Sequence, residues 1–123
     1  MLQLAGIALG GALGSVLRFL LSTRIYQWLG RDFPYGTLSV NVLGCLLMGF
    51  LFVFMADRLL SPEWRATVLV GFLGGFTTFS SFSMETMLLI EQSAYVKALL
   101  NMLLSVGLCL IATWLGMVIA RQL

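Results

Sequence analysis

Two series of polar side chains recur at every fourth position inside long apolar stretches of the sequence. They are, in one stretch, Thr37, Asn41 and Cys45, continued by Gly49, and in the other, Asn101, Ser105, Cys109 and Thr113. A spacing of four places each series on one face of a helix. Amide and hydroxyl groups on such a face can replace water around a small ion, or they can bond neighbouring helices together. The double pattern favours a polar lining, with interhelical hydrogen bonding as the alternative.

The run from Gly71 to Ser83, GFLGGFTTFSSFS, is apolar overall but a poor continuous helix. Paired glycines, paired β-branched threonines and three serines all lower helix propensity. A break at membrane depth is tolerated only where the backbone is buried in protein or lines a cavity. Carbonyl groups freed by such a break suit a hard cation, and the next helix start favours anions. We therefore predict a broken helix, with a merely kinked or flexible helix as the alternative.

Phe79 and Phe82 lie three positions apart, so they share a helix face just after the predicted break. Such a pair usually packs in a core or against lipid. Aromatic rings also carry a positive edge, so ring edges turned into a pore would hold a small anion. The spacing alone favours packing and leaves the anion contact as a hypothesis.

Two ionisable residues, Arg18 and Glu85, fall within apolar stretches, where charged groups are costly and often functional. Arg18 can extend its guanidinium to the membrane interface or serve at a pore mouth. Glu85 has no basic residue within one helical turn, so a local ion pair does not explain it. It is either neutral in apolar surroundings or placed in a water-filled vestibule, and we favour the aqueous path.

The composition excludes most classes of protein. Of the 123 residues, 60% are hydrophobic and only 10% are charged, and the net charge is +2. Soluble domains carry about a quarter charged residues, so soluble enzymes, nucleic-acid binders and disordered proteins are excluded. The chain has no histidine, which excludes imidazole catalysis and imidazole metal sites. No nucleotide motif is present either, so we expect an integral membrane protein that is not an enzyme.

Turn residues and charges divide the chain into four stretches long enough to cross a bilayer. We predict spans at about 2–29, 34–56, 62–91 and 95–120, which together form one transmembrane domain over 1–123. Pro34 suits the first position of the second helix. Ser61, Pro62 and Glu63 are typical of a cap, a first-position proline and a first-turn acid at the start of the third. The predicted fold is an all-α membrane bundle.

Six of the seven basic residues divide evenly between the two sides of the membrane, and Arg18, well inside the first span, is not counted. The side of the termini holds Arg58, Arg65 and Arg121, and the other side holds Arg24, Arg31 and Lys97. Orientation follows the bias in Lys and Arg, so a balanced count indicates either a weak signal or insertion in both orientations. A chain inserted both ways can form an antiparallel two-fold dimer.

Gly6, Gly10 and Gly14 form a ridge of small residues on the first span. Such a ridge lets helix backbones approach closely. The pattern predicts tight packing but leaves open whether the partner is a helix of the same chain or of a second copy.

Three motifs together resemble the Fluc (CrcB-type) family of bacterial fluoride channels, over essentially the whole chain. They are Gly10-Gly11-Ala12-Leu13-Gly14 through Arg18-Phe19, Gly36-Thr37-Leu38-Ser39-Val40-Asn41, and the run 71–82. The resemblance implies an antiparallel, dual-topology homodimer that exports fluoride passively through two pores across the bacterial cytoplasmic (inner) membrane. It also implies a structural sodium ion at the dimer centre, held by backbone carbonyls of Gly74 and Thr77 from both subunits.

The resemblance also implies roles for individual side chains. Phe79 and Phe82 become fluoride contacts through their ring edges, and Asn41 becomes a pore-lining donor. The residues expected along a polar track are Thr37, Ser80, Ser83, Glu85 and Ser105. Arg18 is expected near a wide vestibule, where it attracts anions. Which of Asn101, Ser105 and Cys109 contacts the ion stays open.

An alternative is a small dual-topology antiporter of the multidrug-resistance type, which exchanges protons through an acidic residue in its first span. The first span here holds Arg18 and no acid, which counts against it. A noncatalytic assembly subunit would explain the hydropathy and the glycine ridge, but not the polar stripes and the broken helix.

Overall fold

The computed structural model describes residues 1–58 and 60–123. Four long apolar helical segments, each long enough to cross a membrane, make up the chain. Three of the segments are single helices: α1 (Leu2–Leu29), α2 (Tyr35–Ala56) and α6 (Tyr95–Ala120). The third segment along the chain consists of α3 (Pro62–Arg65), the π-helix η1 (Ala66–Leu73), α4 (Gly74–Phe76) and α5 (Phe79–Glu91). The predicted all-α membrane architecture is confirmed.

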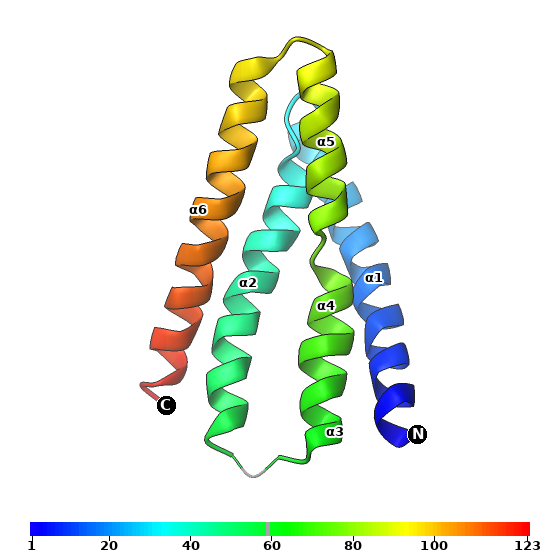
Figure 1. Cartoon of the computed structure of the whole chain (residues 1–123), viewed down its shortest axis with the longest axis vertical. Helices are drawn as coiled ribbons and strands as arrows, with labels where there is room; N and C mark the ends of the chain where they lie inside the picture. Colours follow the sequence, from blue (N-terminus) through cyan, green and yellow to red (C-terminus); the bar gives the residue numbers. More distant parts are fainter. Residues whose placement is uncertain (59) are drawn as a thin grey trace.

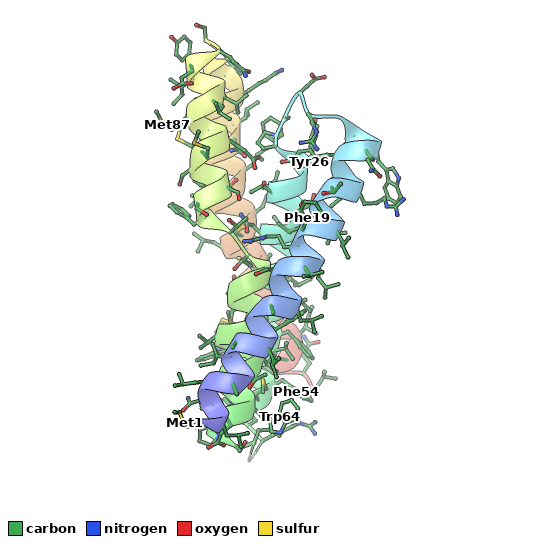
Figure 2. The ribbon with its side chains drawn as sticks, turned by 90° about the vertical axis from the view of Figure 1, so that its right-hand side faces the viewer. Met1, Phe19, Tyr26, Phe54, Trp64 and Met87 are labelled. Carbon is green, nitrogen blue, oxygen red and sulfur yellow. The ribbon has the colours of Figure 1, made fainter. Side chains whose placement is uncertain are left out.

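Both termini lie at the same end of the molecule, as an even number of spans requires (Figure 1). Met1, Phe54 and Trp64 mark that end, and Tyr26 and Met87 lie toward the other (Figure 2). Many large apolar side chains project outward along the bundle, among them Leu9, which is 73% exposed. In a water-soluble protein such surfaces would aggregate, whereas lipid tails cover them in a membrane.

The boundaries of the helices agree with the prediction to within one residue, with one correction. Ser61 caps α3 by accepting a hydrogen bond from the Trp64 N–H at 3.4 Å, and Pro62 is the first helical residue. Pro34, predicted to begin the second helix, instead lies just outside it with ψ of 57°, and α2 begins at Tyr35. The residue is still at the helix start, where its missing N–H costs nothing.

The third segment is broken between α4 and α5, as predicted. Thr77 and Thr78 are extended, with ψ of 155° and 115°, and the helix resumes at Phe79. Figure 1 shows the thin connection between α4 and α5 midway along the bundle. The π-helical turns of η1 before the break were not predicted by the sequence, because π turns have no clear sequence signature.

The glycine ridge of α1 packs against the third segment of the same chain. A Cβ atom on Gly10 would lie 2.5 Å from the Thr67 carbonyl oxygen. Glycines on the facing segment approach the α1 backbone just as closely. A Cβ on Gly71 would lie 2.7 Å from the Ile7 carbonyl, and one on Gly75 would lie 2.6 Å from that of Gly11. Only residues without a side chain allow this approach, so the open question about the ridge is answered in favour of an intramolecular partner.

A second close contact fixes α2 against α6, two helices that run in the same direction (Figure 1). A Cβ on Gly49 would collide with the Thr113 carbonyl, and a Cβ on Gly116 would lie 2.7 Å from the Phe50 N–H nitrogen. Gly49 and Thr113 belong to the two predicted polar stripes. The stripes therefore face one another in register. The offset of 64 positions between Gly49 and Thr113 also pairs Cys45 with Cys109 and Asn41 with Ser105.

Candidate functional site

A cavity of about 280 Å³ lies beside the break, between α2, α5 and α6. It is where the two polar stripes and the aromatic pair meet. Its lining residues are Asn41, Cys45, Thr77, Thr78, Phe79, Phe82, Ser105, Val106, Cys109 and Leu110. The walls thus combine an amide, hydroxyls, thiols and two aromatic rings in an otherwise apolar setting.

The side-chain amide of Asn41 bonds to both backbone polar groups of Thr78. Its Nδ2 donates to the Thr78 carbonyl at 2.9 Å, and its Oδ1 accepts from the Thr78 N–H at 2.7 Å. The extended residue at the break therefore keeps its hydrogen bonds although it has left the helix. Since an amide carries two N–H donors, Asn41 retains one more to offer to the cavity.

The same side-chain bonds release two backbone carbonyls. In a continuous helix the N–H groups of Thr78 and Ser81 would bond to the carbonyls of Gly74 and Thr77. Here the Thr78 N–H bonds to Asn41, and the Ser81 N–H bonds to the Thr78 hydroxyl at 3.2 Å. The carbonyls of Gly74 and Thr77 thus lose their helical partners. Arg18 donates to the Thr77 carbonyl at 3.3 Å.

Phe79 and Phe82 lie together on the cavity wall. Their ring centroids are 5.3 Å apart and their planes are inclined at 49°. Phe79 is 76% exposed, so the pair does not belong to a buried core within this chain. Both rings border the cavity, and an aromatic ring attracts negative charge at its edge.

A second polar cluster joins α1, α2 and α5. Glu85 accepts hydrogen bonds from the Tyr26 hydroxyl at 3.0 Å and from the Thr37 hydroxyl. The Tyr26 oxygen also accepts the Thr37 N–H at 3.4 Å. Tyr26 is absent from the sequence-based set of site residues, because spacing along one helix does not show which residues of another helix lie within its reach.

This cluster borders a separate hollow of about 260 Å³ that also contains Arg18. Thr78 lines both this hollow and the cavity at the break. Thr78 therefore lies between the hollow that contains Arg18 and Glu85 and the cavity that contains Phe79 and Phe82. Arg18 does not extend to the membrane interface, since its guanidinium bonds to the Thr77 carbonyl.

The stripe on α6 divides into two kinds of residue. Asn101 is 1% exposed and donates to the Thr86 hydroxyl at 2.9 Å, while Ser105 donates to Asn101 Oδ1 at 3.3 Å. Asn101 therefore serves interhelical bonding, and Ser105 and Cys109 line the cavity. Thr86 was missed from the sequence, although it lies one turn after Phe82, whose carbonyl it bonds at 2.7 Å.

Ser80 and Ser83 lie outside the set of cavity-lining residues. The Ser83 hydroxyl bonds back to the Phe79 carbonyl at 3.0 Å, and the Ser80 hydroxyl lies 3.3 Å from that of Thr78. Hydroxyl groups in apolar helices commonly bond to their own backbone in this way. Within a single chain they are therefore next to the break but not on the cavity wall.

Comparison with known proteins adds an independent line of information. The family model described as "CrcB-like protein, Camphor Resistance (CrcB)" matches residues 5–117. A protein of Methylococcus capsulatus is 59% identical over 99% of this chain, which spans only 54% of that relative's length. Relatives from Magnetococcus marinus and Geobacter metallireducens are 54% and 49% identical and are matched over 98% and 100% of both chains.

All three relatives carry the name "Fluoride-specific ion channel FluC". The match to the family model covers nearly the whole chain and includes the glycine ridge, the cavity and the broken third segment. The chain belongs to the CrcB-like protein family.

Proposed function

We propose that the chain forms a fluoride-selective channel that allows passive efflux of fluoride across the cytoplasmic (inner) membrane. The observation that carries the proposal is the cavity at the helix break, which is lined by Asn41, Ser105 and the aromatic pair Phe79 and Phe82. The names of the relatives support fluoride as the permeant ion and a channel rather than an enzyme.

The chemistry of the cavity suits a small, strongly hydrated anion. Such an ion must exchange its water for other donors as it enters an apolar region. Asn41 has a remaining N–H for this purpose, and the Ser105 hydroxyl can supply a second donor if it turns away from Asn101 Oδ1. The positive ring edges of Phe79 and Phe82 add attraction without a fixed charge, so the ion is held weakly enough to leave again.

We assign Arg18 and the polar cluster to the approach to this cavity. The hollow with Arg18, Thr37 and Glu85 meets the cavity at Thr78. A guanidinium raises the local concentration of anions. In this proposal, fluoride gathers near Arg18, passes the hydroxyl groups of Thr78, Ser80 and Ser83, and then crosses the phenylalanine pair down its gradient.

We further propose that two copies assemble as an antiparallel, dual-topology homodimer. The even distribution of basic residues between the two membrane sides supports insertion in both orientations. The 76% exposure of Phe79 beside the cavity supports completion of the ion path by a partner. An antiparallel pair would present the same surface from both copies and so close upon itself.

The backbone at the break also fits a structural sodium ion at the dimer centre. Side chains divert the N–H groups that would otherwise bond to the carbonyls of Gly74 and Thr77. Two such carbonyls from each copy would give four oxygen ligands, which is the ligand type that hard cations prefer. Arg18 uses one lone pair of the Thr77 carbonyl, and a carbonyl has a second.

The alternative of a proton-coupled antiporter of the multidrug-resistance type is not favoured. Its first span would need an acidic residue, whereas α1 contains Arg18 and no Asp or Glu. The relatives are also named as ion channels.

Ion flux from liposomes tests the proposed function. Purified protein is reconstituted into vesicles loaded with potassium fluoride, and valinomycin is added to balance charge while an electrode follows fluoride release. We expect rapid fluoride release and no comparable release from matched vesicles loaded with chloride. Equal rates for both anions would overturn the selectivity, and a fluoride rate equal to that of protein-free vesicles would overturn the channel.

A further inference from the structure

The two cysteines of the chain, Cys45 and Cys109, come together although 64 positions separate them in sequence. Cys45 comes from α2 and Cys109 from α6, and both are free, half-buried thiols on the wall of the same cavity. The polar stripes account for their position on each helix, but fluoride coordination gives a thiol no evident role, because S–H is a weak donor.

The packing of the two helices places these thiols at the same level on facing helices. Gly49 and Thr113, one turn further along each helix, meet at van der Waals distance because Gly49 has no side chain. The same register places Cys45 opposite Cys109, and both side chains line one cavity. Neither residue belongs to a flexible loop, since both are in the interior of long helices.

Two neighbouring thiols can supply only two soft ligands to a metal ion, and this limits the ions that they suit. Thiolate sulfur selects soft metal ions such as Cu⁺ over hard ions such as Mg²⁺ or Ca²⁺. Structural zinc sites need four ligands, and among residues 1–58 and 60–123 no group of three or more His, Cys, Asp or Glu is placed to hold a metal. A pair of sulfurs suits ions that accept two ligands in a line, namely Cu⁺, Ag⁺ and Hg²⁺.

We propose that Cys45 and Cys109 form a binding site for one soft, two-coordinate metal cation in the wall of the cavity. On binding, each S–H group releases its proton to water in the cavity, and two sulfur–metal bonds form without any change in oxidation state. The site differs in chemistry from the carbonyls at the break, which are oxygen ligands for a hard cation. It joins α2 to α6 through a metal in place of a disulfide.

Binding is tested on the full-length protein in detergent, with Hg²⁺ as the probe and glutathione as the competing ligand. We expect one mercury per chain by elemental analysis, together with thiolate-to-metal charge-transfer absorption in the ultraviolet. The variants Cys45→Ala and Cys109→Ala should each bind about 100-fold more weakly, because a second ligand on the same scaffold acts at high effective concentration. The double variant should bind none against the competitor.

Several outcomes would overturn the site. Two mercury ions per wild-type chain would mean that each cysteine acts alone, and a single variant that competes as well as the wild type would mean that the other thiol is not a ligand. Protein that binds no mercury, although both thiols react with an alkylating reagent, would also exclude it. Thermal unfolding of each variant in detergent controls for misfolding.

A consequence for flux rests on the proposed function and is measured separately. A metal at this position lies beside Phe82 and Ser105, which line the same cavity. We expect Hg²⁺ to slow fluoride release through the wild type relative to its own untreated rate, and to leave the double variant at its own untreated rate. Untreated wild type that releases no fluoride would refute the channel and not the metal site, which the stoichiometry measures.

Discussion

The side chain of Asn41 on α2 replaces the helical hydrogen bonds that the Thr78 backbone lacks at the break. One amide satisfies both the N–H and the carbonyl of that residue, at 2.7 and 2.9 Å. The break in the third segment thus depends on a side chain from a different helix. Without these bonds, two backbone groups at membrane depth would lack partners, and each such group costs several kcal/mol in lipid.

Replacement of Asn41 by Ala should destabilise the fold as well as impair flux. Loss of both bonds leaves the Thr78 backbone unpaired, so we expect the free energy of unfolding to fall by about 2 kcal/mol or more. Thermal or denaturant unfolding in detergent measures the change. Cys45→Ala, one turn along the same stripe, removes a thiol that makes no bond to the break and should cost less. Equal stability of the two variants would contradict the bridging role.

Replacement of Phe79 or Phe82 by Ile should nearly abolish fluoride release while the proposed dimer stays intact. The change removes the ring edge but keeps an apolar side chain, and Phe79 contributes little to burial because it is 76% exposed. Liposome flux measures the loss, and size-exclusion chromatography checks the assembly. Phe52→Ile, at an exposed position on α2, is the matched control. Unchanged flux in both variants would remove the rings from the mechanism.

Replacement of Tyr26 by Phe should weaken the polar cluster on Glu85. The variant keeps the ring but loses the hydroxyl that donates to Glu85 at 3.0 Å and accepts from the Thr37 N–H. We expect a loss of about 1 kcal/mol in the free energy of unfolding. Tyr95→Phe, which removes a hydroxyl from a 64% exposed residue, should leave stability unchanged. A stability loss as large in Tyr95→Phe would mean that the cluster is not its cause.

Replacement of Gly10 by Ala should destabilise the chain, whereas the same change at the neighbouring Gly11 should not. A Cβ at Gly10 would lie 2.5 Å from the Thr67 carbonyl, and one at Gly11 would lie 3.7 Å from its nearest neighbour. Overpacking of this kind costs about 1–3 kcal/mol. Unfolding in detergent compares the two variants. If both behave alike, α1 and the third segment are not packed as closely as described.

A reporter at the C-terminus should be found on both faces of the membrane. The three basic residues on each side give the insertion machinery no consistent bias. Parallel fusions to a periplasmic and a cytoplasmic reporter should both be active. Added lysines at one end should shift the population to a single orientation and lower fluoride flux, because antiparallel pairs could no longer form. A reporter active on one face only would refute dual topology.

The spans, the break and the faces of the polar stripes were predictable because each follows from local spacing. Apolar length determines a span, and a four-residue repeat determines a face. The partner of each side chain was not predictable, since spacing along one helix says nothing about its neighbour. Asn101 and Asn41 both belong to such a stripe, yet Asn101 bonds to Thr86 and Asn41 to the Thr78 backbone.

The hydrogen-bond partners of the serine and threonine hydroxyls could also not be predicted from the sequence. Ser83 bonds to its own helix, whereas the Thr78 hydroxyl accepts the Ser81 N–H and caps α5. The choice depends on whether the local backbone leaves an N–H free. Tyr26 was missed for a related reason, because only the bundle shows that Glu85 is within its reach.

The fit of Gly49 to Thr113 and of Gly116 to Phe50 has a consequence for how the chain tolerates changes in length. Because these contacts set the alignment of α2 with α6, an extra or missing residue in the loop before α6 would not shift the cavity wall. A single-residue insertion between Asn41 and Gly49 would rotate one end of α2 by about 100°. Such an insertion would separate the amide from the break while both halves of the helix still form.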